Sequence, residues 1–285
     1  MNGIIDVGGG MRGVYTAGVY DYLLDHQIRF DYCIGVSAGS ANMMSYLAGQ
    51  RGRNKRFYVD YAGRRDYMSW SNFLRKGSYL DLDYIYSALS NSDGEDPVDY
   101  EAFLASPAQY VVVATNGLTG APHYFTKSDT RKDGYEIVKA SCALPIACKP
   151  YEIDGIPYFD GGVADPVPYR KALSDGCDRI VVLLTRPRDF VRGPQKPMRV
   201  AQRALRRYPK ALESLKQRHI RYNEAVSELK RLEAEGKALL LAPADIDGMS
   251  TLTRNEMAME RLYGYGYQDA AKIAGFLESS NERES

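Results

Sequence analysis

The sequence predicts an α/β fold in which helices cover both faces of a mostly parallel central sheet. Two segments of the same design support this prediction. Residues 3–7 and 32–34 are short apolar runs, and each leads through glycines into a stretch with helical spacing of apolar residues. A third run, residues 110–115, is continuously apolar and rich in β-branched side chains, which is typical of a central strand.

Length and composition favour one globular domain. An apolar content of 45% and a charged content of 26% are those of an ordinary globular protein. We find no linker or internal repeat, so we expect one domain over residues 1–285, with a catalytic core at about 3–185 and a C-terminal helical part at about 196–277. The net charge of +1 gives no overall attraction to nucleic acid, and we expect no such partner.

The start of the chain and its cysteines indicate a compartment. A predicted strand begins almost at once, without a basic leader or an apolar signal core. No apolar run approaches the ~20 residues that span a bilayer. Four cysteines lack metal-ligand spacing and are expected to be buried free thiols: Cys33, Cys142, Cys148 and Cys177. We therefore expect a cytoplasmic protein without metal or other cofactor; contact with a membrane surface and the oligomeric state stay open.

The segment around Ser37 predicts a nucleophile. Gly35-Val36-Ser37-Ala38-Gly39 places a serine between two glycines, which allows a sharp bend from a strand into a helix at about residues 37–48. Such a bend holds the hydroxyl clear of the sheet and directs the positive end of the helix dipole toward it. The alternative is a glycine-serine-glycine turn without chemistry, and the five residues alone do not decide between the two.

The glycine loop after the first strand predicts an anion-binding site. Gly8-Gly9-Gly10-Met11-Arg12-Gly13 precedes a helix that reaches about residue 26, so its N–H groups can converge on a negative oxygen. Arg12 adds a positive charge. The loop also fits a dinucleotide-binding pattern, but the acidic residue required at the end of the second strand is missing. Because parallel strands would place this loop and Ser37 at one edge of the sheet, it can instead bind an oxyanion formed at Ser37.

The candidate base is Asp160. A predicted hairpin over residues 151–162, with Asp154-Gly155 in its turn, carries Asp160 into a Gly161-Gly162 bend. An ordinary Asp-Gly turn is the alternative there. Histidine is the usual partner of a nucleophilic serine, but none of the three histidines follows a strand near the end of the sheet, and His123 is the least unsuitable. A partly desolvated Asp160 is the better base.

Two further segments have more than one interpretation. In the tyrosine-rich residues 51–91, Tyr67, Met68 and Trp70 either pack against the sheet or form a lid or acyl-chain wall. The basic stripe is expected on a short helix broken by Pro209, and it comprises Arg199, Arg203, Arg206, Arg207 and Lys210. A solvated helix face is the default interpretation of this stripe, and contact with anionic lipid is the alternative.

Taken together and in this order, the glycine loop, the Ser37 motif and Asp160-Gly161-Gly162 resemble the patatin-like phospholipases, a family of serine lipid acyl hydrolases that use a Ser-Asp dyad. The resemblance covers about residues 3–168, and residues 208–223 look similar to a bacterial subgroup of predicted esterases. Plant members often have an acid before the three glycines, where this chain has Val7.

The resemblance implies a three-layer α/β/α fold and the hydrolysis of lipid or acyl esters. It implies Ser37 as nucleophile, Asp160 as base, and a set of oxyanion-hole and supporting residues. These are Gly8, Gly9 and Gly10 with Arg12 beside them for the hole, and Gly35, Gly39, Gly161 and Gly162 for the motifs. A non-catalytic lipid-binding or regulatory protein of this fold is the main alternative, and a dinucleotide-binding protein the weaker one.

Overall fold

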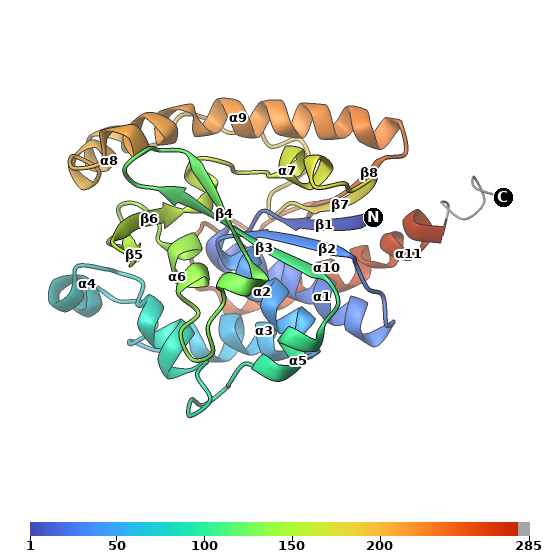
Figure 1. Ribbon diagram of the computed structural model, residues 1–285, viewed down its shortest axis with the longest axis horizontal. Helices are drawn as coiled ribbons and strands as arrows, with labels where there is room; N and C mark the ends of the chain where they lie inside the picture. Colours follow the sequence, from blue (N-terminus) through green and yellow to red (C-terminus); the bar gives the residue numbers. More distant parts are fainter. Residues whose placement is uncertain (279–285) are drawn as a thin grey trace.

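The computed structural model describes residues 1–278, and within them one eight-stranded sheet lies between two layers of helices (Figure 1). This arrangement confirms the predicted three-layer α/β/α fold with a mostly parallel sheet. Five strands are parallel to one another: β1 (Asn2–Asp6), β2 (Tyr32–Val36), β3 (Gln109–Asn116), β7 (Arg179–Leu183) and β8 (Ala238–Leu241). Three strands are antiparallel to their neighbours: β4 (Pro122–Thr126), β5 (Tyr151–Ile153) and β6 (Ile156–Asp160).

The strand order is β5-β6-β3-β2-β1-β7-β8, with β4 also paired to β3. The central strands are buried on both faces, and their side chains alternate between two cores. Ile4 belongs to one core and Ile5 to the other, and Val112 and Val113 divide in the same way. This explains why these strands read as continuous apolar runs in the sequence.

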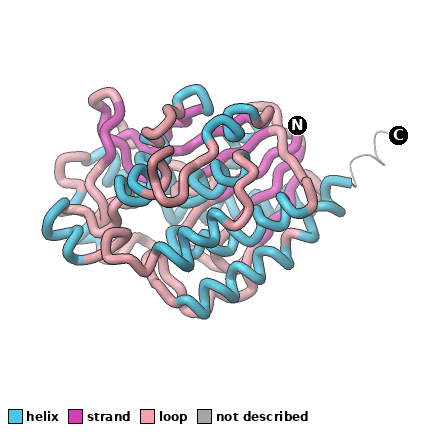
Figure 2. Tube along the Cα trace, turned by 90° about the horizontal axis from the view of Figure 1, so that it is seen from below, coloured by secondary structure: helices cyan, strands magenta, loops and turns pink. Residues whose placement is uncertain are grey.

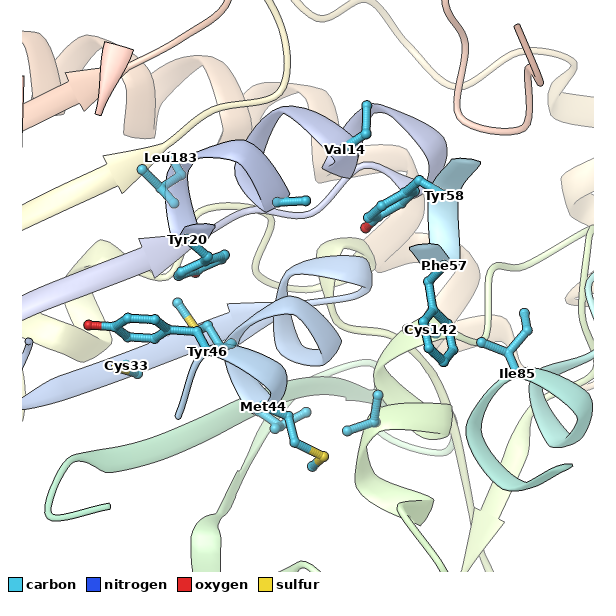
Figure 3. Close-up of a cluster of buried hydrophobic side chains, with 14 of the residues drawn as sticks. Val14, Tyr20, Cys33, Met44, Tyr46, Phe57, Tyr58, Ile85, Cys142 and Leu183 are labelled. Carbon is cyan, nitrogen blue, oxygen red and sulfur yellow. The ribbon is translucent and has the colours of Figure 1, made fainter. Parts of the chain in front are cut away.

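One helical layer lies below the sheet in Figure 1, and the view from below in Figure 2 shows it in front of the strands. Its main helices are α1 (Val14–Asp25), α2 (Ala38–Leu47), α6 (Glu136–Cys142) and α10 (Glu256–Asp269). Figure 3 shows part of the core between these helices and the sheet, where Tyr20 and Tyr46 pack between the layers at a ring separation of 5.1 Å. Both rings are fully buried or nearly so.

The other layer lies above the sheet and consists mainly of α7 (Tyr169–Ser174) and α9 (Pro209–Ala234). The sequence predicted that Pro209 would break the short helix that carries the basic stripe. Pro209 instead occupies the first turn of α9, where proline's missing N–H costs nothing and its fixed φ suits a helix. The preceding helix, α8 (Met198–Ala204), is accordingly shorter than expected.

The remaining elements are short and lie around the edges of the layers. They are α3 (Arg53–Arg56), α4 (Trp70–Lys76), α5 (Tyr100–Ala105), α11 (Ala271–Glu278), η1 (Gly10–Gly13), η2 (Phe57–Tyr61), η3 (Tyr84–Ala88), η4 (Lys127–Asp129) and η5 (Gly161–Val163). Over residues 1–278, no helix combines the length and the apolar character needed to cross a membrane.

Candidate active site

Ser37 occupies the sharp bend between β2 and α2. Its φ of 56° and ψ of −132° are a strained conformation for a residue with a side chain. The flanking glycines make the bend possible because neighbouring backbone approaches them closely. A Cβ atom on Gly35 would lie 2.5 Å from Ser40 Cα, and one on Gly39 would lie 2.6 Å from Asp6 Cγ. The bend is thus set by the glycine positions.

Hydrogen bonds to its backbone hold Ser37 in this conformation. The Ser37 N–H donates to Ser141 Oγ at 2.7 Å, and the Ser141 hydroxyl donates to the Val113 carbonyl at 2.6 Å. The Ser37 carbonyl accepts from both the N–H and the hydroxyl of Ser40, at 2.9 and 2.7 Å. All four residues are buried, so breaking any of these bonds would leave polar groups without water.

The register of the sheet brings Asp160 to Ser37. Along one edge of β3, Val113 pairs with Val36 of β2, and the next residue, Ala114, pairs with Asp160 of β6. The opposite edge of β3 is occupied by β4 over the same residues. Strand β6 therefore lies along the same edge of β3, beginning where β2 ends. On this edge Asp160 comes next after Val36, the residue that precedes Ser37.

Asp160 is a buried carboxyl group with few but specific partners. Burial raises the pKa of Asp160 above its ordinary value; the charge of Arg218, a hydrogen bond from the Ser37 hydroxyl and one from the Gly162 N–H act in the opposite direction. The Gly162 bond measures 2.8 Å to Oδ1. A raised pKa makes the carboxylate a stronger proton acceptor than an exposed aspartate.

The glycine loop lies beside this pair with all three glycines at positive φ. The Gly8 N–H donates to Asp6 Oδ1 at 2.9 Å, and the Gly8 carbonyl accepts from the Thr185 hydroxyl. Within residues 1–278, the N–H groups of Gly9 and Gly10 have no acceptor. Of the three amides expected to form an oxyanion hole, that of Gly8 donates to Asp6, whereas those of Gly9 and Gly10 are available to an acceptor.

Arg12 lies against the same loop. Its Nε donates to the Thr185 carbonyl at 3.1 Å, and Nη1 lies 3.4 Å from the Thr251 hydroxyl. Burial and the nearby charge of Arg186 lower the pKa of Arg12 to about 9. Arg12 still carries a positive charge at neutral pH, close to the N–H groups of the glycine loop.

Ser37 borders two cavities of different character. The first, the cationic cavity, is lined by Ser37, Asp160 and the glycine loop. Four arginines also line it: Arg12, Arg186, Arg192 and Arg218. The second, the apolar cavity, is lined mainly by Met11, Tyr58, Tyr67, Met68, Ile85 and Tyr86. Both include Gly10, Leu144 and Thr251, so the two adjoin at the serine. Figure 3 shows Tyr58, Ile85 and Cys142, three of the residues that line the apolar cavity, on the same side of the core.

Family models match most of the chain in two parts. A model described as patatin-like phospholipase matches residues 7–173, and a domain of unknown function, DUF6363, matches residues 208–278. The chain belongs to the patatin-like phospholipase family. It is 30% identical over 190 residues to the uncharacterized protein YjjU of Escherichia coli K12, which covers 66% of this chain and 53% of YjjU. The chain thus spans about half the length of that relative.

A solved structure supports the fold. The crystal structure of VipD from Legionella pneumophila matches with a TM-score of 0.54 and 13% identity, over 98% of this chain and 67% of VipD. At this identity the similarity concerns the fold alone. The family consists of lipid acyl hydrolases, and Ser37 and Asp160 both fall inside the matched residues 7–173.

In this patatin-like fold the histidines do not lie with Ser37 and Asp160. His123 is exposed on β4, where it pairs with Ala114 from the opposite edge of β3 to Asp160. His26 stacks on Tyr22 at the end of α1, and neither it nor His219 lines the cationic cavity. Asp160 is accordingly the base candidate that the fold brings to the serine.

Several residues of the site were not found from the sequence as site residues. Ser141 anchors the backbone of Ser37, whereas Arg186, Arg192, Arg218 and Tyr222 line the cationic cavity. Arg218 and Tyr222 are four residues apart on α9 and therefore share a helix face, which was the one available signal. Arg186 and Arg192 follow β7 in an irregular segment, where no pattern distinguishes them from surface arginines.

Proposed function

We propose that this protein is a serine lipid acyl hydrolase in which Ser37 is the nucleophile, Asp160 the general base, and the N–H groups of Gly9 and Gly10 the oxyanion hole. The proposal depends above all on one observation: Ser37 and the buried carboxyl group of Asp160 line the same cavity, and the Ser37 hydroxyl is among the groups that lower the raised pKa of that carboxyl group. A hydroxyl paired with a desolvated base is the arrangement that activates serine for attack.

The first half of the reaction is acyl transfer to the enzyme. Ser37 Oγ attacks the ester carbonyl carbon while its proton passes to Asp160, and the carbonyl oxygen becomes an oxyanion within reach of the Gly9 and Gly10 amides. When the tetrahedral intermediate collapses, the bond to the alcohol oxygen breaks and Asp160 returns the proton to that oxygen. Loss of one oxyanion donor typically raises such a barrier by ~2.7 to 4 kcal/mol.

The second half is hydrolysis of the acyl-serine. Asp160 accepts a proton from a water molecule as the water oxygen attacks the acyl carbon. The Ser37–acyl bond then breaks, the fatty acid leaves, and Asp160 returns the proton to Ser37 Oγ. The same carboxyl group thus acts as base and acid in each half, so both halves need it to start ionised.

We assign the acyl chain to the apolar cavity. Tyr67 and Met68, two of the residues flagged in the sequence as a potential acyl-chain wall, are buried there, and Met68 forms a bridge with Leu80. Aromatic and methionine side chains supply apolar surface that adapts to a flexible chain. Leu144 lies where the two cavities meet, which is where the ester group would be.

We further propose that α4 contacts the lipid surface. It lies between the two ends of the Met68–Leu80 bridge, and it exposes Trp70 by 72% and Leu74 by 84%. The basic stripe Arg199, Arg203, Arg206, Arg207 and Lys210 is also exposed, on α8 and its continuation. In Figure 1 both helices lie at the same end of the molecule, so apolar insertion and attraction to anionic lipid can act together.

Labelling with a fluorophosphonate probe tests the nucleophile directly. Wild type should react rapidly, Ser37→Ala should not react, and Ser227→Ala, at an exposed serine on α9, should react like wild type. Asp160→Asn should lose turnover of short p-nitrophenyl esters while keeping the same circular dichroism spectrum. Wild type that labels no faster than Ser37→Ala would refute the catalytic role and favour a non-catalytic lipid-binding protein.

A further inference from the structure

The cationic cavity contains more positive charge than ester hydrolysis requires. Arg12, Arg186, Arg192 and Arg218 line it together with a single carboxyl group, that of Asp160. Three of these arginines come from outside the matched phospholipase model, Arg186 and Arg192 from the segment after β7 and Arg218 from α9. The extra charge is therefore contributed by the C-terminal part of the chain.

Three of these guanidinium groups form no ion pair within residues 1–278: those of Arg186, Arg192 and Arg218. The charges of Arg218 and Arg192 act on the one carboxyl group that lines the cavity, that of Asp160, whose pKa they lower. The Nε atom of each of the three arginines is buried without a hydrogen-bond acceptor in the part of the chain that the structure describes. Arg53, buried elsewhere, differs: it bonds to Ser45 and Ser90 and lies 3.6 Å from the Asp96 carboxylate. Buried charges normally have such partners, so the cavity has more arginines than its one carboxyl group can compensate.

The arginines are nevertheless held in place. The Asn223 side chain accepts a hydrogen bond from the backbone N–H of Arg192 at 2.9 Å and donates one to the backbone carbonyl of Arg192 at 3.0 Å. The Arg192 guanidinium lies 4.7 Å from the centre of the Tyr222 ring, and Arg186 lies 4.2 Å from that of Phe190. Stacking on aromatic rings leaves the guanidinium edges free for paired hydrogen bonds to the oxygens of a phosphate or carboxylate.

The arginines also affect one another. The neighbouring charge of Arg218 adds to burial in lowering the pKa of Arg186, and burial with Arg218 and Arg186 lowers the pKa of Arg192 to about 9. Like charges that lower one another's pKa in this way repel, and an anion bound between them would relieve the repulsion. Arginine forks match phosphate oxygens in pairs, and a phosphate monoester carries ≈ −1.5 to −2 charges at pH 7.

We propose that the cationic cavity binds a phosphate monoester on the alcohol part of the ester substrate, so that the enzyme prefers acyl esters of glycerol phosphate. This inference depends on the hydrolase function proposed above. The acyl chain occupies the apolar cavity, the ester lies at Ser37, and the phosphate meets Arg186, Arg192 and Arg218. A zwitterionic phosphocholine group fits less well, because among the lining residues only Asp160 could face its cation.

Binding is measured first, without turnover. Titration calorimetry uses Ser37→Ala protein with sn-glycerol 3-phosphate, phosphocholine, glycerol and inorganic phosphate. We expect saturable binding of glycerol 3-phosphate, at least about tenfold weaker for phosphocholine, and absent for glycerol. Adding Arg192→Gln should weaken binding of glycerol 3-phosphate by about tenfold to a hundredfold, since a hydrogen bond to a charged group is lost. Arg192→Lys should recover part of it.

Arg29→Gln is the matched control, because Arg29 is exposed just before β2 and does not line the cavity. Turnover is then compared for a monoacylglycerol and its 3-phosphate with the same acyl chain. The ratio of their kcat/KM values should favour the phosphate by at least about tenfold in wild type and in Arg29→Gln. It should fall toward one in Arg192→Gln.

The outcomes separate the two proposals. Arginine-dependent binding of glycerol 3-phosphate without hydrolysis of either ester would support the cavity and refute the hydrolase. Hydrolysis of both esters with a ratio near one, and no saturable binding, would refute the cavity alone. An equal loss of kcat/KM on both esters in Arg192→Gln would mean that the arginine stabilises the oxyanion. Inorganic phosphate that binds as tightly as glycerol 3-phosphate would make free phosphate the ligand. Either result overturns the inference.

Discussion

Asp6 should make the stability of this protein fall between about pH 4 and pH 6. The side chain is fully buried beneath the glycine loop, with Oδ1 bonded to the Gly8 N–H and Oδ2 without a partner within residues 1–278. Burial raises the pKa of Asp6 from 3.8 to about 6, because ionisation there would leave a charge out of water. We test this with Asp6→Asn, which keeps the size and the oxygen acceptor but cannot ionise.

The direction in which stability changes with pH follows from the number of protons that the folded and the unfolded chain bind. Well below pH 3.8 the carboxyl group is protonated in the folded and the unfolded chain and contributes no pH dependence. Between the unfolded value of 3.8 and the folded value of about 6, the unfolded chain loses the proton and the folded chain keeps it, so stability falls as pH rises. At about 1.36 kcal/mol per pH unit, the free energy of unfolding falls by roughly 3 kcal/mol over the whole titration.

Urea unfolding at a series of pH values measures the effect. The one tryptophan, Trp70, is exposed, so far-ultraviolet circular dichroism is the better signal. The difference between wild type and Asp6→Asn removes the contribution of other groups that titrate in the same range, Asp160 among them. That difference should change by about 2 kcal/mol between pH 4 and pH 6.5, in favour of the variant at the higher pH. Parallel curves would refute the assigned pKa and the account of the buried Asp6.

Three further predictions concern the site and the surface. Ser141→Ala leaves the buried Ser37 N–H without an acceptor and should lower the free energy of unfolding by about 1 to 3 kcal/mol in urea, together with kcat; an unchanged midpoint would contradict the role of this bond. Because Asp160 must be ionised, kcat/KM on a p-nitrophenyl ester should fall as pH drops through a pKa above the usual aspartate value, and a profile flat down to pH 4 would exclude Asp160 as base. Trp70→Ala with Leu74→Ala should reduce sedimentation with anionic vesicles several-fold, whereas activity on a water-soluble ester should stay unchanged; undiminished sedimentation would exclude α4 as the contact.

The fold and the bends that carry Ser37 and Asp160 could be predicted because their signals are local. An apolar run, a glycine at fixed spacing and a helical period are all determined by a few neighbouring residues, as at Ser37 and at the Asp154-Gly155 turn. Both turn residues have positive φ, as a two-residue hairpin turn requires. Pro209 was misinterpreted because a proline fits both the end of one helix and the start of the next, and only the following turn distinguishes them.

The rest of the site could not be predicted because tertiary contacts create it. Arg12, Arg192 and Arg218 are far apart in the sequence, and an arginine on a charged helix such as α9 looks like any solvated residue. The Gly8 amide was expected to face an oxyanion, but it donates a hydrogen bond to Asp6, two residues earlier in the chain. A sequence pattern identifies a loop rich in N–H donors without showing which of them have acceptors.

The shared edge of β3 means that the spacing of Ser37 and Asp160 is determined by main-chain pairing rather than by side-chain packing. A slip of β6 by one residue would move the carboxylate by about 3.3 Å along the strand and turn it to the far face of the sheet. Insertions in the hairpin loop or in the Tyr-rich segment leave this spacing untouched. We therefore expect the chemistry to tolerate large changes in the surrounding loops, and to disappear all at once when a single residue is added or deleted within Ile156–Asp160.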